Sequence, residues 1–455
     1  MVKRLPHEEA VLASLRPTCE EREHVCDLAQ QLLAAIEKSG KAKGMVVGSV
    51  ARDTWIRGDR DLDVFLLFDP GLSRERLETE GLTLARSIAA SFTDQYHEKY
   101  AEHPYISASI DNEDVDLVPC YDVDSATKIQ SAVDRTPFHT RYITEKINCL
   151  IDDVLLLKQF TKAGRIYGSD QMTEGFSGYL CELLVLHYGG FTQLLEAAAE
   201  WRPHMIIDLE KHGAKEFGEP LVVIDPVDPR RNVAAAVSLD RMVEFVELAR
   251  GYLETPSDLF FTIPDEQTIS AGELEALLEQ RGTHLYAITF ETPPYIEEVV
   301  VPQLKRSMVT IHEHLERNGF CVHHAHYAMQ QEKCMLLFEL TVSRLPHIRA
   351  HIGPPVWNRV NAEKFRSKHI TSSLPGPYIV QGRYETEIPR EYTEAKVLLS
   401  SPSLLQLSLG RHVRHSLENN WQVSEGKDCW SPEFTSFIAG FFGRCSPLVR
   451  IRQKK

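Results

Sequence analysis

The sequence predicts a multidomain α+β protein, in which regions that mix helices and strands flank a mostly helical region. The chain has 455 residues, and at roughly 100–200 residues per domain this length predicts about three domains. Helical and strand-like patterns follow one another in separate blocks along the chain. The hydrophobic fraction of 43% is enough for packed cores. No apolar run approaches the ~20 residues that a membrane helix needs.

Charge and cysteine usage exclude some classes of protein. The formal net charge is −15, from 50 basic and 65 acidic residues, which argues against a protein that coats nucleic acid indiscriminately. A local basic face is still allowed, because RNA affinity depends on where the charges lie. The nine cysteines form no Cys-x-x-Cys pair, and the N-terminus has no apolar segment typical of a signal peptide. We therefore expect reduced thiols and a cytoplasmic location.

The first region, 1–147, is expected to be a small α/β domain. Residues 1–40 are expected to be helical, because apolar residues recur at helical spacing between Val25 and Ile36. Residues 45–68 then predict a buried strand, a Gly-Ser turn, a short helix and a second strand. The remaining expected elements are a helix over 72–99 and strands over 105–110 and 115–118.

The second region, 148–256, is expected to be mostly helical. A loop with several prolines at 225–233 interrupts it, and Ser238 or Asp240 is the expected cap of the helix that follows. The expected helices run over 150–161, from 175 to about 199, and from the cap to about 253.

The third region, 257–375, predicts a sheet with one long helix. The order is a strand at 285–290, a helix at 295–318, and strands at 320–327 and 333–340. This strand-helix-strand-strand order suits a ferredoxin-like or split βαβ sheet. Residues 376–455 are expected to form a further small unit.

Three aspartates predict a metal site. Asp61 and Asp63 begin a strand and point to one face of it. Two such carboxylates repel each other unless a cation lies between them, and hard oxygen ligands suit Mg²⁺. A lone Asp-x-Asp is more often a solvated strand end, but Asp116 begins another strand downstream and a Gly-Ser turn lies upstream. This combination predicts a two-metal site, in which one Mg²⁺ activates an attacking hydroxyl and the other holds a triphosphate.

The Gly-Ser turn predicts a phosphate contact. Gly48 lets the backbone approach an anion closely, and N–H groups at a helix N-terminus bind phosphate. Ser49 adds a hydroxyl donor, and Arg52 lies one turn along the same helix. The alternatives are a plain turn and a surface salt bridge of Arg52.

Three further residues remain open between two interpretations from the sequence alone. His139 lies in a polar loop that a turn and a helix cap would explain. Lys158 lies in an apolar helix, where it could equally extend to the surface. Tyr167 stands between two glycines and could pack in a core or stack on a base.

Several motifs resemble one family over nearly the whole chain. The stretches 47–55, 61–65 and 115–121 (Val-Gly-Ser-Val-Ala-Arg-Asp-Thr-Trp, Asp-Leu-Asp-Val-Phe and Val-Asp-Leu-Val-Pro-Cys-Tyr) resemble the DNA polymerase β-type nucleotidyltransferase fold. So do 134–139 and 175–182. The set, together with Arg-Arg-Asn-Val-Ala at 230–234 and His-Ile-Gly-Pro-Pro-Val at 351–356, resembles the archaeal, class I CCA-adding tRNA nucleotidyltransferases.

This resemblance implies a polymerase β-like head at 1–147, a helical neck at 148–256, a ferredoxin-like body at 257–375 and a small tRNA-binding tail at 376–455. It implies that the three aspartates bind Mg²⁺ and activate the RNA 3′-hydroxyl. Many family members carry Glu at the position of Asp61, so the shorter side chain departs from the family pattern. The residues implied to contact the incoming nucleotide are Gly48, Ser49, Arg52, Thr136, His139, Lys158, Tyr167 and Arg231.

The family adds C, C and A to the 3′ end of tRNA without a nucleic-acid template, from CTP and ATP, and its members are typically homodimers. The resemblance thus gives the basic segments a purpose, namely contact with the acceptor stem and T arm of tRNA; a solvated surface is the alternative. Residues 344–369 carry six Lys or Arg against one Glu. The candidate tRNA contacts are Arg349, Arg359, Lys364, Arg366, Arg411 and Arg414.

Two other functions compete with CCA addition. One is a poly(A) polymerase or oligoadenylate synthase of the same superfamily, against which the segment 351–356 and the whole-length resemblance argue. The other is a catalytically inactive RNA-binding protein on the same scaffold, against which the three aspartates argue.

Overall fold

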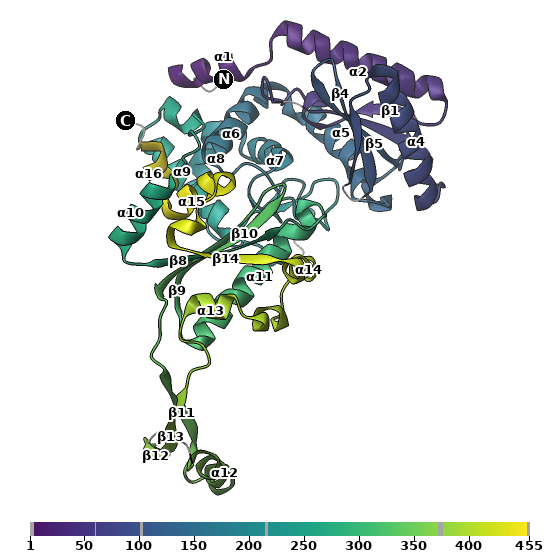
Figure 1. Ribbon diagram of the computed structural model, residues 1–455. Coiled ribbons are helices and arrows are strands. Elements are labelled where there is room, and N and C mark those ends of the chain that lie inside the picture. Colours follow the sequence, from purple (N-terminus) through teal and green to yellow (C-terminus); the bar gives the residue numbers. More distant parts are fainter. Residues whose placement is uncertain (1–3, 60, 101–102, 214–216, 372–375, 453–455) are drawn as a thin grey trace. The chain divides into compact units, whose positions relative to one another are not determined.

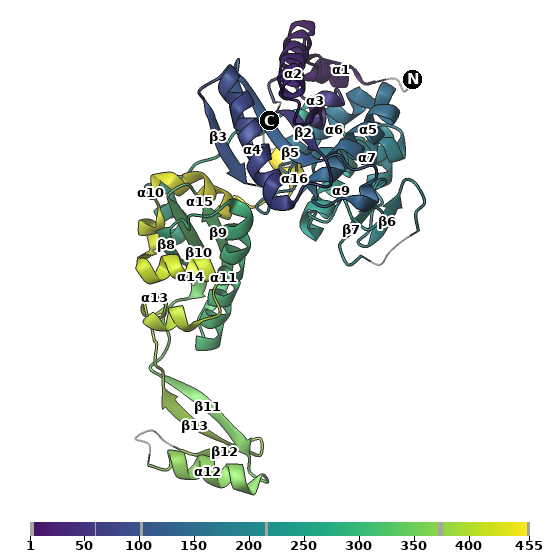
Figure 2. The ribbon, with the colours of Figure 1, turned by 90° about the vertical axis from the view of Figure 1, so that its right-hand side faces the viewer.

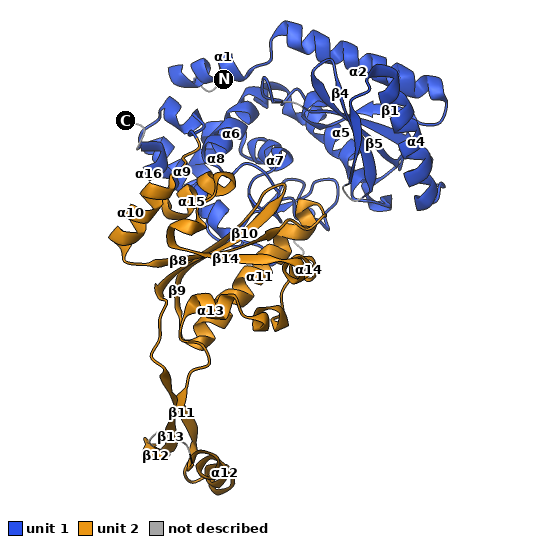
Figure 3. Cartoon of the chain, in the orientation of Figure 1, with its two compact units in different colours: residues 1–265, 445–455 blue, residues 266–444 orange. Residues whose placement is uncertain are grey.

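The computed structural model describes residues 4–59, 61–100, 103–213, 217–371 and 376–452. The chain forms two compact units, one of residues 1–265 with 445–455 and one of residues 266–444 (Figures 1 and 3). No helix in the described ranges is long and apolar enough to cross a membrane. The nine cysteines are all free thiols. The mixed α+β architecture predicted from the sequence is confirmed.

The first unit begins with a five-stranded sheet in the order β1-β2-β5-β4-β3. The central pair, β2 and β5, is parallel, and the other neighbours are antiparallel. Helices α2 and α4 pack on one face of this sheet, and their buried residues share its core (Figure 1). The elements are β1 (Lys43–Val46), β2 (Asp61–Phe68), β3 (Tyr96–Tyr100), β4 (Pro104–Ile110), β5 (Glu113–Tyr121), α2 (Cys19–Ser39) and α4 (Arg74–Phe92).

Two predicted helices of this region differ from the structure. The described residues 4–40 contain two helices, α1 (Pro6–Leu15) and α2, where one helical stretch was predicted over 1–40. Pro17 and the capping box of Thr18 with Glu21 start the second helix anew. The helix predicted to reach residue 99 ends at Phe92, and the exposed edge strand β3 follows. An exposed edge strand has no apolar face to reveal it in the sequence.

A helical layer completes the first unit. Its apolar core is continuous from α6 through α9. The single helix predicted from 175 to about 199 is two helices, because Gly189 and Gly190 have φ values of +80° and +150° that a helix cannot contain. A short parallel pair, β6 with β7, lies in a region predicted as helical. The elements are α3 (Gly48–Ala51), α5 (Thr136–Ile147), α6 (Ile151–Ala163), α7 (Gly178–Tyr188), α8 (Phe191–Ala198), α9 (Leu239–Glu254), α16 (Pro447–Arg452), β6 (Met205–Asp208) and β7 (Leu221–Ile224).

The second unit contains an antiparallel sheet in the order β14-β8-β10-β9. Numbered along the chain, this is the 4-1-3-2 order of a ferredoxin-like sheet, as predicted. The fourth strand, β14, comes from the segment predicted as a separate tail, so the boundary at 375/376 does not separate two sheets. The elements are β8 (His284–Glu291), α11 (Glu297–Asn318), β9 (Cys321–Met329), β10 (Lys333–Val342), β14 (Trp421–Glu425), and the flanking helices α10 (Ala271–Arg281), α13 (Ala395–Leu399), α14 (Arg411–Asn419) and α15 (Thr435–Phe442).

A small three-stranded sheet is inserted between β10 and α13. Its order is β11-β13-β12, and helix α12 packs on β11 and β13 (Figure 2). The predicted body–tail boundary falls inside this sheet, between α12 and β12. The elements are β11 (Ile348–Pro355), α12 (Arg359–His369), β12 (Tyr378–Val380) and β13 (Arg383–Pro389).

Candidate active site

The central parallel strands bring the three predicted carboxylates to one end of the sheet. Asp63 on β2 lies opposite Asp116 on β5, and Asp61 lies two residues before Asp63 on the same strand. Burial, followed by the charges of Asp116 and Asp61, raises the pKa of Asp63 to about 7. Burial and the neighbouring charges also raise the pKa of Asp61. The carboxylates therefore repel one another and would be stabilised by a cation between them.

The shape of this site fits an oxygen-bound cation. A Cβ atom at Gly48 would lie 2.1 Å from Oδ2 of Asp63, so the glycine leaves room for that carboxylate beside the turn. The backbone N–H of Val47 donates to the carbonyl of Asp63 at 2.9 Å and fixes the turn against β2. Within the described ranges, no group of three or more His, Cys, Asp or Glu side chains is already gathered as a metal centre. The donor set and the space at Gly48 nevertheless suit a hard cation such as Mg²⁺.

Gly48→Ala is expected to abolish nucleotide incorporation while lowering stability only slightly. Gly48 and Gly58 both have a φ of +73°, but none of the residues that the structure describes comes within 4 Å of a Cβ at Gly58. Gly58→Ala should therefore cost only the backbone strain, about 1 kcal/mol of unfolding free energy. Gly48→Ala should cost a similar amount of stability and also displace the Asp63 carboxylate. Nucleotide incorporation and thermal unfolding of the two variants test this, and equal activities would contradict the role of Gly48.

The stability of the metal-free protein should depend on pH through Asp63. A carboxyl group whose pKa is raised in the folded state contributes stability below its unfolded pKa of about 3.9, and that contribution is lost as pH rises through about 7. In EDTA at pH 8, the unfolding free energy of Asp63→Asn should therefore exceed that of wild type by at most about 4 kcal/mol. Near pH 4 the two unfolding free energies should be equal. A difference in unfolding free energy that stays constant between pH 4 and pH 8 would contradict the raised pKa of Asp63.

A buried ion network joins the turn at Gly48 to the helical layer. Arg52 Nε donates to Glu182 Oε1 at 3.0 Å, and Arg52 Nη1 donates to Thr140 Oγ1 at 3.3 Å. Thr54 Oγ1 donates to the same Glu182 oxygen at 2.5 Å. Lys158 Nζ lies 4.0 Å from Glu182 Oε1 and donates to the carbonyl of Thr54 at 2.7 Å. Arg52 and Lys158 are both buried, so neither is the surface residue that the alternative interpretation allowed.

Burial lowers the pKa of Lys158, while the charge of Glu182 opposes that shift. Two buried cations therefore share one buried carboxylate, an arrangement with an excess of positive charge that suits an anionic ligand nearby. Glu182 was not among the predicted site residues. It is the last residue of the motif at 175–182, but nothing in its apolar neighbours distinguishes it from a surface glutamate.

Tyr167 lies beside the start of α7, close to Lys158. A Cβ at Gly178 would be 3.0 Å from the hydroxyl of Tyr167 and 3.5 Å from Lys158 Nζ. Lys162 lies over the Tyr167 ring, with its Nζ 5.1 Å from the ring centroid. Burial raises the pKa of Tyr167. The ring therefore lies beside Lys158 and is half-buried against the core of the helical layer.

A second buried carboxylate, Asp225, connects two of the predicted nucleotide contacts. Its Oδ2 lies 2.9 Å from Nε2 of His139 on α5 and 2.9 Å from Nη1 of Arg231. The ring of His139 stacks on Tyr179 with centroids 4.1 Å apart. Neither Asp225 nor Tyr179 was predicted. The prolines around Asp225 indicate a loop, and a loop aspartate is usually solvated.

The remaining predicted nucleotide contacts lie on the same elements. Ser49 is in α3, directly after Gly48, and Thr136 is the first residue of α5. Asp134, just before α5, accepts the backbone N–H groups of Tyr121 and Ser131. This fixes the start of α5 to the end of β5.

The six candidate tRNA contacts lie in the second unit. Four of them are exposed on β11 and α12, and Arg366 pairs with Glu363 at 2.8 Å. Arg411 is exposed at the start of α14. Arg414 is half-buried and donates to the carbonyl of Leu407, so its side chain is partly occupied within the protein. The exposed four are Arg349, Arg359, Lys364 and Arg366.

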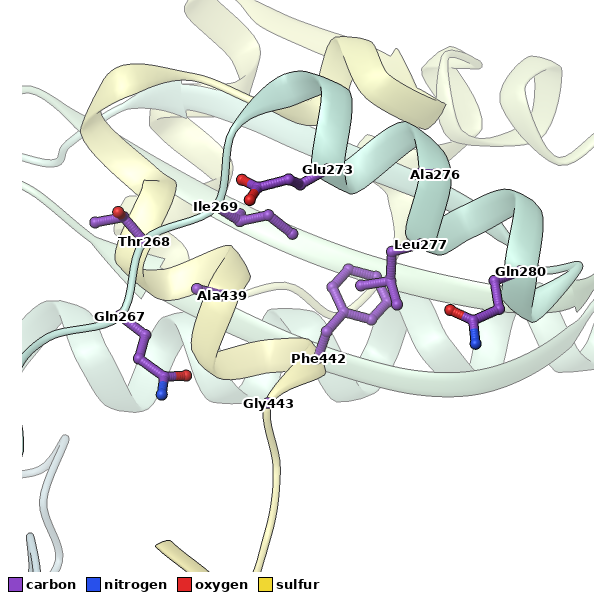
Figure 4. Close-up of a pocket in the computed structure, with 10 residues that line it drawn as sticks. All are labelled: Gln267, Thr268, Ile269, Glu273, Ala276, Leu277, Gln280, Ala439, Phe442 and Gly443. Carbon is purple, nitrogen blue, oxygen red and sulfur yellow. The ribbon is translucent and has the colours of Figure 1, made fainter. Parts of the chain in front are cut away.

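An open hollow of about 480 Å³ lies between α10 and α15 in the second unit (Figure 4). Its walls include Ile269, Leu277 and Phe442, with Gln267 and Gln280 at the sides. None of the predicted site residues lines it. The hollow is therefore separate from the site described above.

Three family models match successive parts of the chain. A nucleotidyltransferase domain family matches residues 28–139, which contain β2, β5 and all three aspartates. The second domain of tRNA nucleotidyltransferases matches residues 152–262, and the C-terminal domain of the CCA-adding enzyme matches residues 281–426. The fold and the site thus define a nucleotidyltransferase.

Curated relatives identify the family. The CCA-adding enzyme of Methanoregula boonei is 68% identical over 456 residues, covering 100% of this chain and 99% of the relative. Those of Methanosarcina barkeri and Methanosarcina mazei are 42% and 41% identical, covering 91% and 92% of this chain and 93% of each relative. The chain belongs to the family of CCA-adding enzymes.

Proposed function

We propose that this protein adds C, C and A to the 3′ end of tRNA from CTP and ATP without a nucleic-acid template, and releases pyrophosphate. The observation that carries this proposal is the carboxylate set of β2 and β5 beside the Gly48 turn, in a chain similar to CCA-adding enzymes over its whole length. Maturation and repair of tRNA ends is the corresponding cellular role. We also expect a homodimer in the cytoplasm.

In this proposal the chain's own residues prepare the reaction. Asp61, Asp63 and Asp116 hold Mg²⁺, most simply as two ions. Mg²⁺, when bound, supplies a Lewis acid that makes the RNA 3′-hydroxyl a better nucleophile and neutralises charge on the triphosphate. The N–H groups that follow Gly48, with Ser49 and Arg52, bind the triphosphate. These groups hold the α-phosphorus and the 3′-hydroxyl in position.

The helical layer supplies the rest of the nucleotide site. Lys158 adds positive charge from within the network of Glu182, and Tyr167 lies beside it. His139 and Arg231, joined by Asp225, contact the sugar or base. Thr136, the first residue of α5, is a further proposed nucleotide contact.

One incubation separates this proposal from its alternatives. A tRNA transcript lacking its 3′ CCA is given Mg²⁺ with labelled CTP and ATP, and the products are sequenced at the 3′ end. Two C followed by one A supports CCA addition. An open-ended A tail would instead indicate a poly(A) polymerase or an oligoadenylate synthase, and bound but unextended tRNA would indicate an inactive RNA-binding protein.

Replacing Arg349, Arg359 and Arg366 together by Gln should weaken tRNA binding. All three are exposed, and RNA helices are recognised mainly through shape and backbone phosphates. Each lost phosphate contact reduces the slope of log K against log salt by up to about 0.9. Filter binding between 50 and 300 mM salt measures this slope. An unchanged slope would show that these residues of β11 and α12 do not contact tRNA phosphates.

A further inference from the structure

Arg52 is a buried cation whose guanidinium is held at two points by the helical layer. Its Nε donates to the carboxylate of Glu182 on α7, and its Nη1 donates to the hydroxyl of Thr140 on α5 at 3.3 Å. Only 8% of the Arg52 side chain is exposed, and Glu182 and Thr140 are buried as well. Nη2 makes no hydrogen bond with any residue that the structure describes, so its two N–H groups remain for a ligand.

The charge of Arg52 acts on both parts of the site. Burial and the neighbouring carboxylates raise the pKa of Asp63 to about 7, and the charge of Arg52 opposes that shift. Burial lowers the pKa of His139, and the charge of Arg52 adds to that shift. Arg52 is therefore close to a proposed metal ligand and to a proposed nucleotide contact, as a cation that binds the triphosphate must be.

The hydroxyl of Thr140 serves Arg52 and not its own helix. A threonine hydroxyl inside a helix can donate back to a carbonyl of the preceding turn. Thr161 on α6 does so, because its hydroxyl donates to the carbonyls of Leu157 and Lys158, both at 2.9 Å. The Thr140 hydroxyl makes no such bond within the described part of the chain, and its oxygen accepts from Arg52.

Two contacts fix the guanidinium where one would let it turn. Nε and Nη1 belong to one rigid planar group, so partners on two different helices set the orientation of the plane. Glu182 alone would leave the plane free to rotate about a single hydrogen bond. Thr140 supplies the second contact without adding negative charge, so it does not weaken the attraction of Arg52 for an anion.

We propose that Thr140 is a positioning residue for the incoming nucleotide: its hydroxyl, together with Glu182, holds Arg52 in the orientation that binds the triphosphate. The inference rests on the proposed function, because it assigns the triphosphate to Arg52. Thr140 acts through Arg52, so its effect is confined to the triphosphate. The effect is therefore the same for CTP and ATP and leaves tRNA binding unchanged.

Thr140→Val tests this, because Val has the branched shape of Thr but accepts no hydrogen bond. The probe is inorganic tripolyphosphate, which has no base or sugar, and its Kd for the full chain is measured by calorimetry with Mg²⁺ present. We expect Kd to rise about ten-fold, because Nη1 of Arg52 loses its partner. Thr140→Ser keeps the hydroxyl and should restore Kd to within about two-fold of wild type. If Thr140→Val does not fold, Thr140→Ala gives the same test, because Ala fits the space that Thr140 fills.

Thr161→Val is the matched control. Thr161 is also a buried helical threonine, but its hydroxyl donates to carbonyls of its own helix. Its variant should keep the Kd for tripolyphosphate. An unchanged Kd in Thr140→Val, an equal rise in Thr161→Val, or a Thr140→Ser variant as weak as Thr140→Val would each overturn the proposal.

Steady-state kinetics separate this role from a general loss of structure. In Thr140→Val, KM for CTP and KM for ATP should rise by the same factor, while KM for tRNA stays unchanged. A rise confined to one nucleotide, or a parallel rise in KM for tRNA, would overturn the proposal. A wild-type protein that binds tripolyphosphate but adds no nucleotide would reject the proposed function instead, and the Kd values would still decide the role of Thr140.

A double-mutant cycle tests whether Thr140 acts through Arg52. Arg52→Lys keeps the charge but removes the planar group that Thr140 orients. In the Arg52→Lys background, Thr140→Val should change the Kd for tripolyphosphate by less than about two-fold. Additive losses in the double variant would show that Thr140 acts independently of Arg52, and would overturn the proposal.

Discussion

Asp63→Ala and Asp116→Ala are each expected to lower CMP and AMP incorporation by on the order of 10³-fold. Each variant loses a carboxylate from the set that binds Mg²⁺, and a metal ion supplies several kcal/mol of charge stabilisation in the transition state. The protein should stay folded, because removing Asp63 relieves the burial and the repulsion of a carboxylate, which together raise its pKa to about 7. Single-turnover incorporation at saturating Mg²⁺ and thermal unfolding in EDTA are the two measurements.

Asp114→Ala is the matched control for these variants. Asp114 lies on β5 two residues before Asp116, opposite Asp61, and is exposed. The substitution Asp114→Ala removes one negative charge, as Asp63→Ala and Asp116→Ala do, but it removes no proposed Mg²⁺ ligand. Near-normal turnover in Asp63→Ala or Asp116→Ala, or an equal loss in Asp114→Ala, would refute the metal assignment.

Glu182→Gln is expected to lower the unfolding free energy by about 3 kcal/mol. The change keeps the shape of the side chain but leaves Arg52 and Lys158 without their shared carboxylate in the interior. Removing one partner of a buried ion pair typically costs about 3–5 kcal/mol. Because Arg52 and Lys158 are also proposed nucleotide contacts, KM for CTP should rise as well. Denaturant unfolding and steady-state kinetics measure the two effects.

Glu196→Gln provides the comparison, since Glu196 is exposed on α8 in the same helical layer. Its stability should stay within about 0.5 kcal/mol of wild type. If Glu182→Gln lowered the unfolding free energy by as little, the Glu182 carboxylate would not be needed to balance the charges of Arg52 and Lys158.

The parts of the fold with a strong local pattern could be predicted from the sequence. The apolar stripe from Val25 to Ile36 and the strands predicted over 285–290 and 333–340 match the structure, although both strands are buried almost continuously along their length. A ferredoxin-like sheet was predicted as well, although its last strand was not recognised. Trp421–Glu425 is a short edge strand, half-buried at most, and only its partner β8 makes it a strand. Such elements depend on tertiary context more than on local preference.

Some residues of the candidate site could likewise be predicted from the sequence, and others could not. Asp61, Asp63 and Asp116 could be predicted because strand periodicity places them on one face and like charges need a cation there. Glu182 and Asp225 could not, because each acts through partners far away in the sequence. Glu182 meets Arg52 across 130 residues and Asp225 meets His139 across 86. A buried carboxylate in an apolar helix or a proline-rich loop shows its partners only in three dimensions.

The position of β14 has a consequence for synthesis. β14 pairs with Tyr286–Phe290 of β8 on the side away from β10, yet the chain between Glu291 and Trp421 must be made first. At ~5–20 residues per second on the ribosome, that takes on the order of ten seconds. During this time the nascent second unit has an open, largely apolar strand edge, the kind of surface on which unfinished chains associate. The protein is thus most exposed to misassembly, and to chaperone binding, shortly before its last sheet strand emerges.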